Sequence, residues 1–136
     1  MSNPKKRVVV VKDIHDTWGL YSHAIAVGNL LFISGQVALD KEGQVVGKGD
    51  IEVQTDQVMK NIQKILSAEN ATFDDIVKIR VNLVNLEHRP IFHKVRKQYF
   101  KDNLPASTLV IVSSLVDKEL LVEVEAIAYL NKDKAP

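Results

Sequence analysis

The sequence predicts an α+β fold, a two-layer sandwich in which two helices cover one face of a mixed β-sheet. Two amphipathic helical patterns are separated by runs of period-two alternation, and this order favours one sheet over a helical bundle. Apolar residues make up 46% of the 136 residues and aromatic residues only 6%. The core must therefore consist mainly of Val, Ile, Leu and Ala. A chain of this length and balance fits one domain, residues 1–136.

The N-terminal part of the chain predicts a β-hairpin and its neighbours. Three short runs rich in β-branched or other apolar residues are typical of strands, at residues 8–12, 23–27 and 30–34. Gly28 and Asn29 both tolerate positive φ, so they predict a two-residue hairpin loop. Residues 41–43 predict a further turn, after which Val45 and Val46 continue as extended chain.

A helix is expected after Asp50, whose side chain is suited to the N-cap position. The apolar residues that follow recur with a 3.6-residue period, at Val58, Met59, Ile62, Ile65 and Leu66. Lys60 and Lys64 point the other way, and the helix should end near Glu69 and Asn70.

The next segment, residues 76–84, alternates with period two and predicts a half-buried strand. Its apolar face is expected to carry Val77, Ile79, Val81 and Leu83. A second helix follows, with Pro90 in its first turn and Pro105 beyond its end. Its buried side is expected to carry Phe92, Val95 and Tyr99.

Two more strands are predicted at residues 108–112 and 121–130. In the last strand, one face carries Val122, Val124, Ala126, Ala128 and Leu130. The other carries Glu123, Glu125, Ile127 and Tyr129. A second face this apolar on a small protein is expected to meet another subunit.

Composition excludes several classes of function. The formal charge of +1 leaves no broad positive field for a nucleic acid, and the basic residues at 5–7 and at Lys94, Arg96 and Lys97 are interpreted as a solvated tail and a solvated helix face. The absence of cysteine excludes disulfides and thiolate chemistry and fits a reducing cytoplasm. The absence of cysteine is also compatible with export, but residues 8–11 are too short for the apolar part of a signal peptide, and no membrane span is expected.

Few residues suggest chemistry by themselves. The four histidines show no metal-ligand spacing, and His93 on the polar side of the second helix is either an exposed residue or a binding group. No glycine-rich phosphate loop is present. Glu123 and Glu125 share one face of a predicted strand at roughly 6–7 Å. Two carboxylates so placed could raise one pKa to that of a general acid, or they could be ordinary solvated or ion-pairing residues.

Five segments of the chain form a set of motifs. They are Gly19-Leu20-Tyr21-Ser22-His23-Ala24, Leu30-Leu31-Phe32-Ile33-Ser34-Gly35-Gln36, Gln54-Thr55-x-Gln57-x-x-x-Asn61-Ile62, Leu104-Pro105-Ala106-Ser107-Thr108 and Val122-Glu123-Val124-Glu125-Ala126-Ile127-Ala128. Taken together, they resemble the motifs of one known family, the Rid (reactive intermediate deaminase, or YjgF-like) proteins, in the family's order and over about residues 8–130.

This resemblance implies a chorismate-mutase-like fold and a homotrimer with ligand clefts between subunits. Proteins of this family hydrolyse small enamines and imines to a carbonyl compound and ammonia, without a cofactor or metal. The matching positions imply that Glu123 and Tyr21 are catalytic. They imply that Ser34, Gly35, His93 and Ser107 bind the substrate, a small metabolite.

Two positions depart from the family pattern. Ser107 stands where the family has an arginine that grips the substrate carboxylate, and His93 aligns with a frequent asparagine. Loss of such a contact should cost on the order of 2–5 kcal/mol, whereas the serine offers one neutral hydrogen bond worth about 1 kcal/mol. The specificity is therefore expected to differ, toward a substrate that is less anionic or bound by a different cation.

Three functions are compatible with these residues. The first is a deaminase of small imines, enamines or related carbonyl–nitrogen compounds, with altered specificity. The second is a non-catalytic trimer that binds a small ligand, which the loss of the arginine favours and the retention of Tyr21, Ser34 and Glu123 disfavours. The third, an endoribonuclease or translation inhibitor of the L-PSP type, is disfavoured by the near-neutral charge.

Overall fold

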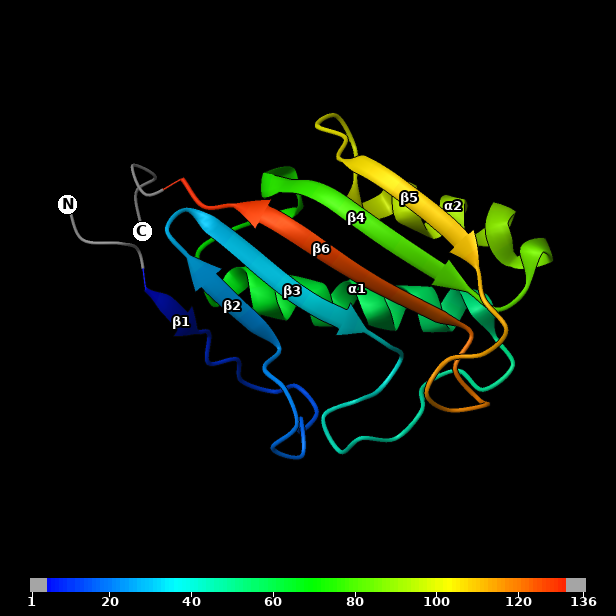
Figure 1. Cartoon of the computed structure of the whole chain (residues 1–136). Coiled ribbons are helices and arrows are strands. Elements are labelled where there is room, and N and C mark those ends of the chain that lie inside the picture. The colour runs from blue at the N-terminus through cyan, green and yellow to red at the C-terminus, as the bar shows by residue number, and fades with distance from the viewer. Residues whose placement is uncertain (1–4, 132–136) are drawn as a thin grey trace.

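The computed structural model describes residues 5–131. Six strands form one mixed sheet in the order β1-β2-β3-β6-β4-β5, and both helices lie behind it in Figure 1. The elements are β1 (Lys6–Val8), β2 (Ala24–Val27), β3 (Leu30–Gln36), α1 (Ile51–Ser67), β4 (Ile76–Leu83), α2 (Arg89–Tyr99), β5 (Ala106–Ile111) and β6 (Val122–Tyr129), with 3₁₀ turns at Phe73–Asp75 and Leu86–His88. Only the β4–β5 pair is parallel. The predicted two-layer fold is confirmed.

The predicted first strand at residues 8–12 is wrong in position, because β1 ends at Val8. Pairing with β2 runs from Lys6 to Val8, opposite Val27 to Ile25, and β2 begins only one residue further on, at Ala24. The last backbone contact is the hydrogen bond from Val9 N to Ala24 O, at 3.0 Å. Residues after Val9 therefore have no residue of β2 left to pair with.

The apolar face of β4 also differs from the prediction at one end. The register with β6 shifts between Ile76 and Lys78, so the alternation is interrupted there. Ile76 is buried, and Val77 is 47% exposed on the opposite side. Ile79, Val81 and Leu83 are buried as expected. A bulge places two residues of one strand opposite one residue of its partner. The sequence of β4 alone does not show where this happens, because every residue in the run is still typical of a strand.

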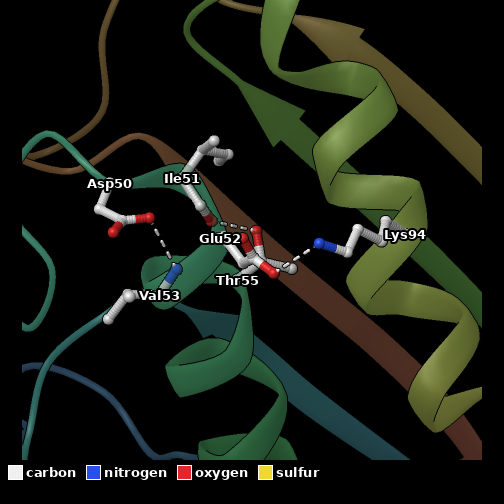
Figure 2. Close-up of polar contacts among 6 residues, drawn as sticks. All are labelled: Asp50, Ile51, Glu52, Val53, Thr55 and Lys94. Atoms are coloured by element: carbon white, nitrogen blue, oxygen red, sulfur yellow. Dashed lines mark hydrogen bonds and ion pairs between the residues drawn. The ribbon is translucent and has the colours of Figure 1, made fainter.

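The hairpin and the two helices form where their local signals lie. Gly28 adopts a φ of 57° in the turn between β2 and β3. Asp50 caps α1 by accepting a hydrogen bond from Val53 N at 3.1 Å (Figure 2). Figure 2 also shows Lys94 of α2 paired with Glu52 of α1 at 2.9 Å, which links the two helices at their exposed sides.

Buried amides of α1 hold the loops at one end of the sheet. Gln54 donates to the carbonyls of Gly47 and Glu119, at 3.1 and 2.8 Å, and accepts from Leu121 N at 2.8 Å. Asn61 donates to the carbonyls of Val37 and Leu39, at 3.1 and 3.0 Å. Because these amides satisfy loop backbone inside the core, they fix the loops between β3 and α1 and before β6.

The core lies between the sheet and the helices. It includes the predicted inward residues of β6 together with the apolar stripes of both helices. The other face of the sheet is open and partly apolar, with exposed Leu30, Phe32, Val77 and Tyr129.

Candidate functional site

Three of the predicted site residues line one groove of about 520 Å³. Tyr21 comes from the loop before β2, Gly35 from the end of β3 and Glu123 from the start of β6. The loops of residues 9–23, 37–50 and 112–121 gather at this end of the sheet (Figure 1). Trp18, Leu20 and Val116 contribute exposed apolar side chains to a lining that is mostly apolar, and Tyr21 and Glu123 contribute polar groups to it.

A bulge in β3 brings its backbone against Glu123. Ile33 pairs with Ala126 and Gln36 with Val124, so three steps along β3 face two steps along β6. A Cβ atom on Gly35 would lie 2.8 Å from Cδ of Glu123 and 3.0 Å from its Cγ. The carboxyl group therefore occupies the space that a side chain at position 35 would take.

Burial raises the pKa of two groups that line the groove, the Glu123 carboxyl and the Tyr21 hydroxyl. Burial raises the pKa of Glu123, and the nearby charge of Glu125 raises it further. Burial also raises the pKa of Tyr21, followed by the charges of Glu123 and Asp16. Of the two alternatives that the sequence left open for the Glu123–Glu125 pair, the direction of this shift agrees with a carboxyl of raised pKa. Both groups can serve as proton donors toward a bound molecule.

A buried histidine supports the loop that carries Tyr21. His23 Nε2 donates to the carbonyl of His15 at 2.7 Å, and Gln36 Nε2 donates to His23 Nδ1 at 3.3 Å. Burial is the first cause that lowers the pKa of His23, which keeps the ring neutral. Ser34 is part of the same support, because its Oγ donates to the carbonyl of Ser22 at 2.6 Å.

Ser34 also lies outside the groove. It lines a separate hollow of about 560 Å³ on the open face of the sheet. Charged side chains in that hollow come from β4 and β6, at Lys78, Arg80 and Glu125. The predicted site residue Ser34 therefore holds the loop through its bond to Ser22, and its side chain lines a different cavity from Glu123.

Ser107 lies in a third place, beside α2, and His93 is a residue of that helix. Ser107 faces Ile79 across the β4–β5 pair, and Ile79 is fully buried under the helices. Ser107 Oγ accepts a hydrogen bond from Arg96 Nη1 at 3.1 Å. Glu123 alternates with the buried Val122 and Val124, so it lies on the opposite face of the sheet. Within one chain, Ser107 and Glu123 do not line a common cavity.

Two residues near the site were not singled out by the sequence. Arg96 was interpreted only as part of a solvated helix face, yet it is half-buried against Ser107. His15 is buried at the wall of the groove, and its Nε2 has no hydrogen-bond partner among residues 5–131. A lone histidine in an irregular loop carries no sequence pattern that would have marked it.

Residues 5–131 contain no group of three His, Cys, Asp or Glu side chains placed to hold a metal ion. No helix in the same range is long and apolar enough to cross a membrane.

Comparisons with known proteins agree on one family. The sequence profile of the family described as endoribonuclease L-PSP matches residues 12–130. A RutC family protein of Pyrococcus horikoshii is 42% identical over 125 residues, which cover 91% of this chain and 98% of that protein. The human 2-iminobutanoate/2-iminopropanoate deaminase is 32% identical over 128 residues, covering 94% and 93% of the two chains. The structure of the Rid protein YyfA from Yersinia pestis matches with a TM-score of 0.86 and 37% identity, over 92% of this chain and 99% of that chain.

Proposed function

Because this chain belongs to the endoribonuclease L-PSP (Rid) family, we propose that it is a deaminase that hydrolyses small imines or enamines. The water-dependent reaction converts R₂C=NH into R₂C=O and NH₃. Support comes from the human relative, whose name states that it deaminates 2-iminobutanoate and 2-iminopropanoate. An enamine would enter the same reaction after protonation at carbon gives its iminium form.

The observation that carries this proposal is the position and raised pKa of Glu123 in the groove beside Tyr21 and Gly35. A protonated carboxyl can give its proton to the imine nitrogen, which makes the carbon electrophilic. Water then adds to that carbon and returns a proton to the carboxylate, which leaves an adduct with a hydroxyl and an amino group. The carboxyl protonates this amino group, the C–N bond breaks, ammonia leaves, and the hydroxyl gives its proton back to the carboxylate as the carbonyl forms. The Tyr21 hydroxyl, whose pKa is also raised, would orient the nitrogen or the water by a hydrogen bond.

The specificity is proposed to differ from that of relatives with an arginine at the position of Ser107. A serine hydroxyl gives one neutral hydrogen bond in place of a two-pronged charged contact. The substrate would then be less anionic, or a different cation would hold its carboxylate.

A homotrimer with grooves between subunits is part of the proposal. Ser107 and Glu123 lie on opposite faces of one sheet, so a site that uses both needs a second copy of the chain. The exposed Phe32 and Tyr129 on the open face support burial of that face between copies. Light scattering should give three times the chain mass of 15.2 kDa. A monomer would remove the basis for a shared site.

Ser107 also favours a second candidate, a trimer of the same fold that binds a small metabolite without catalysis. An endoribonuclease is not supported, because the net charge of +1 provides no positive groove for a nucleic acid. A cytoplasmic location is proposed from the absence of cysteine.

The test is a coupled assay in which an amino-acid oxidase generates imines and their decay is followed with and without this protein. Glu123→Gln should lower the acceleration by about 100-fold or more, as for loss of a general acid. Glu125→Gln is the comparison variant, because it removes only the second cause of the raised pKa of Glu123 and leaves its burial in place, so it should cost less than about tenfold. If the human relative accelerates the reaction and this protein does not, the deaminase proposal fails, and binding without turnover would favour the second candidate.

A further inference from the structure

Arg96 has a half-buried guanidinium with little to neutralise it. Its Nη1 donates to Ser107 Oγ at 3.1 Å, and its Cζ lies 5.7 Å from the centre of the Phe100 ring. Within residues 5–131, ion pairs join Arg7 to Glu69, Lys60 to Asp56 and Lys94 to Glu52, and none includes Arg96. A guanidinium has five N–H donors. Most of them are left for another acceptor.

The surroundings of Arg96 are positive. Residues 89–101 contain five Lys or Arg residues and no Asp or Glu. The pKa of His93, one turn before Arg96, is lowered first by burial and then by the charges of Arg96, Arg89 and Lys97. No carboxylate contributes to that shift. Burial is likewise the one cause of the shift at Arg96, so no carboxylate among residues 5–131 acts on its guanidinium strongly enough to offset that burial.

A purely structural role explains this arrangement poorly. A cation in the last turn of a helix is stabilised by the helix dipole, but the exposed Lys97 already occupies that turn. Burial lowers the pKa of Arg96, which means that its charged form is held at a cost in free energy. A ligand anion would remove that cost.

We propose that Arg96 and the Ser107 hydroxyl form an anion-binding pair that holds the carboxylate of the substrate. This anion-binding pair rests on the proposed function. In it, Arg96 supplies the positive charge that Ser107 does not carry. The hydroxyl oxygen accepts the Arg96 hydrogen bond, so its own hydrogen remains free to donate to the ligand. Guanidinium and hydroxyl then present donors to one carboxylate, and the ligand class is a small 2-oxo or 2-imino acid.

The experiment measures binding of 2-oxobutanoate and of its neutral methyl ester to the assembled full-length protein by calorimetry. Arg96→Gln should weaken binding of 2-oxobutanoate by about tenfold or more and leave the ester within about twofold. Lys97→Gln removes the same charge from the same turn without the contact to Ser107, and it should cost about twofold or less. The urea midpoint of Arg96→Gln should not fall, because a buried charge without a counterion is removed.

Two results would overturn the anion-binding pair: no measurable binding of 2-oxobutanoate to the natural protein, or equal binding by Arg96→Gln. Imine hydrolysis that still depends on Glu123 would leave the proposed function standing in either case. Conversely, binding through Arg96 without any imine hydrolysis would support the anion site and reject the deaminase.

Discussion

Because Gly35 lies against Glu123, the added methyl group of Gly35→Ala should lower activity while changing the stability of the protein only slightly. In Gly35→Ala, the new Cβ would start 2.8 Å from Cδ of Glu123. Ordinary contact begins near 3.4 Å, so Cδ must move by about 0.6 Å, and the closer carboxylate oxygen must move further. The bulge holds the backbone of Gly35, whereas the end of the Glu123 side chain is free to rotate. The displacement should therefore fall on the carboxyl group.

Misplacement of a reacting group by about 1 Å can cost on the order of 100-fold in rate. Gly35→Ala should accordingly lower the imine hydrolysis rate by about 10- to 100-fold. Stability should change by no more than about 1 kcal/mol. Gly35 does not adopt a positive φ, so alanine meets no backbone strain there, and the smaller entropy of the unfolded chain offsets part of the contact cost.

Gly49→Ala is the matched control for this substitution. Gly49 has a φ of 72°, and a Cβ there would meet no atom within 4 Å. It should lose about 1–2 kcal/mol of stability through the left-handed backbone and keep its activity per folded molecule. The two variants should thus show opposite signatures in the coupled imine assay and in urea unfolding. Full activity in a folded Gly35→Ala protein would refute the role given to the Glu123 carboxyl.

Two further predictions concern the buried polar groups that support the site. Asn61→Ala should destabilise the protein by about 2–4 kcal/mol in urea unfolding, because the carbonyls of Val37 and Leu39 lose their donors inside the core; a loss under about 1 kcal/mol would contradict this. The pKa of His23 is lowered by burial from its ordinary value of 6.5, so the unfolded chain takes up a proton that the folded chain resists, and stability should fall as the pH drops below about 6.5. His23→Gln should lose less stability between pH 7 and 5.5, and equal losses in the two proteins would show that His23 does not control this dependence.

Strong periodic patterns in the sequence predicted most helices and strands of this fold. They did not predict where a strand contains a bulge or ends early. The stripe of α1 and the alternation of β6 are long enough to outweigh local variation. Asp50 marks the start of α1, and Gly28 marks the turn between β2 and β3. The bulge near Val77 and the early end of β1 depend on which residues of the partner strand are placed to pair with them. Pairing of this kind is a tertiary property that a single strand's sequence does not contain.

For the site, residues alone placed Glu123 and Glu125 on one face of a strand but left open whether one carboxyl has a raised pKa or both are ordinary solvated residues. The burial that is the first cause of the raised pKa of Glu123 depends on the loops around it, which the strand's own sequence does not contain. The proximity of Tyr21 and Gly35 to Glu123 came only from the family resemblance. Alternation assigns a residue to one side of its own strand, but Ser107 and Thr108 are consecutive polar residues in β5 and three apolar residues follow them, so this strand shows no alternation. The sequence therefore did not determine on which side of the sheet Ser107 lies, and the structure places it beside α2.

The position of Arg96 did leave a signal in the sequence. Phe92, Val95 and Tyr99 mark the buried stripe of α2, and a helix turns by 100° per residue, so His93 and Arg96 lie together along one border of that stripe. A border residue with a long side chain can reach the neighbouring strand, whereas a residue opposite the stripe cannot. Charge counting treated Lys94, Arg96 and Lys97 alike, although only Arg96 borders the stripe on this side. The substitution of arginine by serine at position 107 therefore has to be judged together with Arg96, since the hydroxyl that replaced one guanidinium is the group that another guanidinium now contacts.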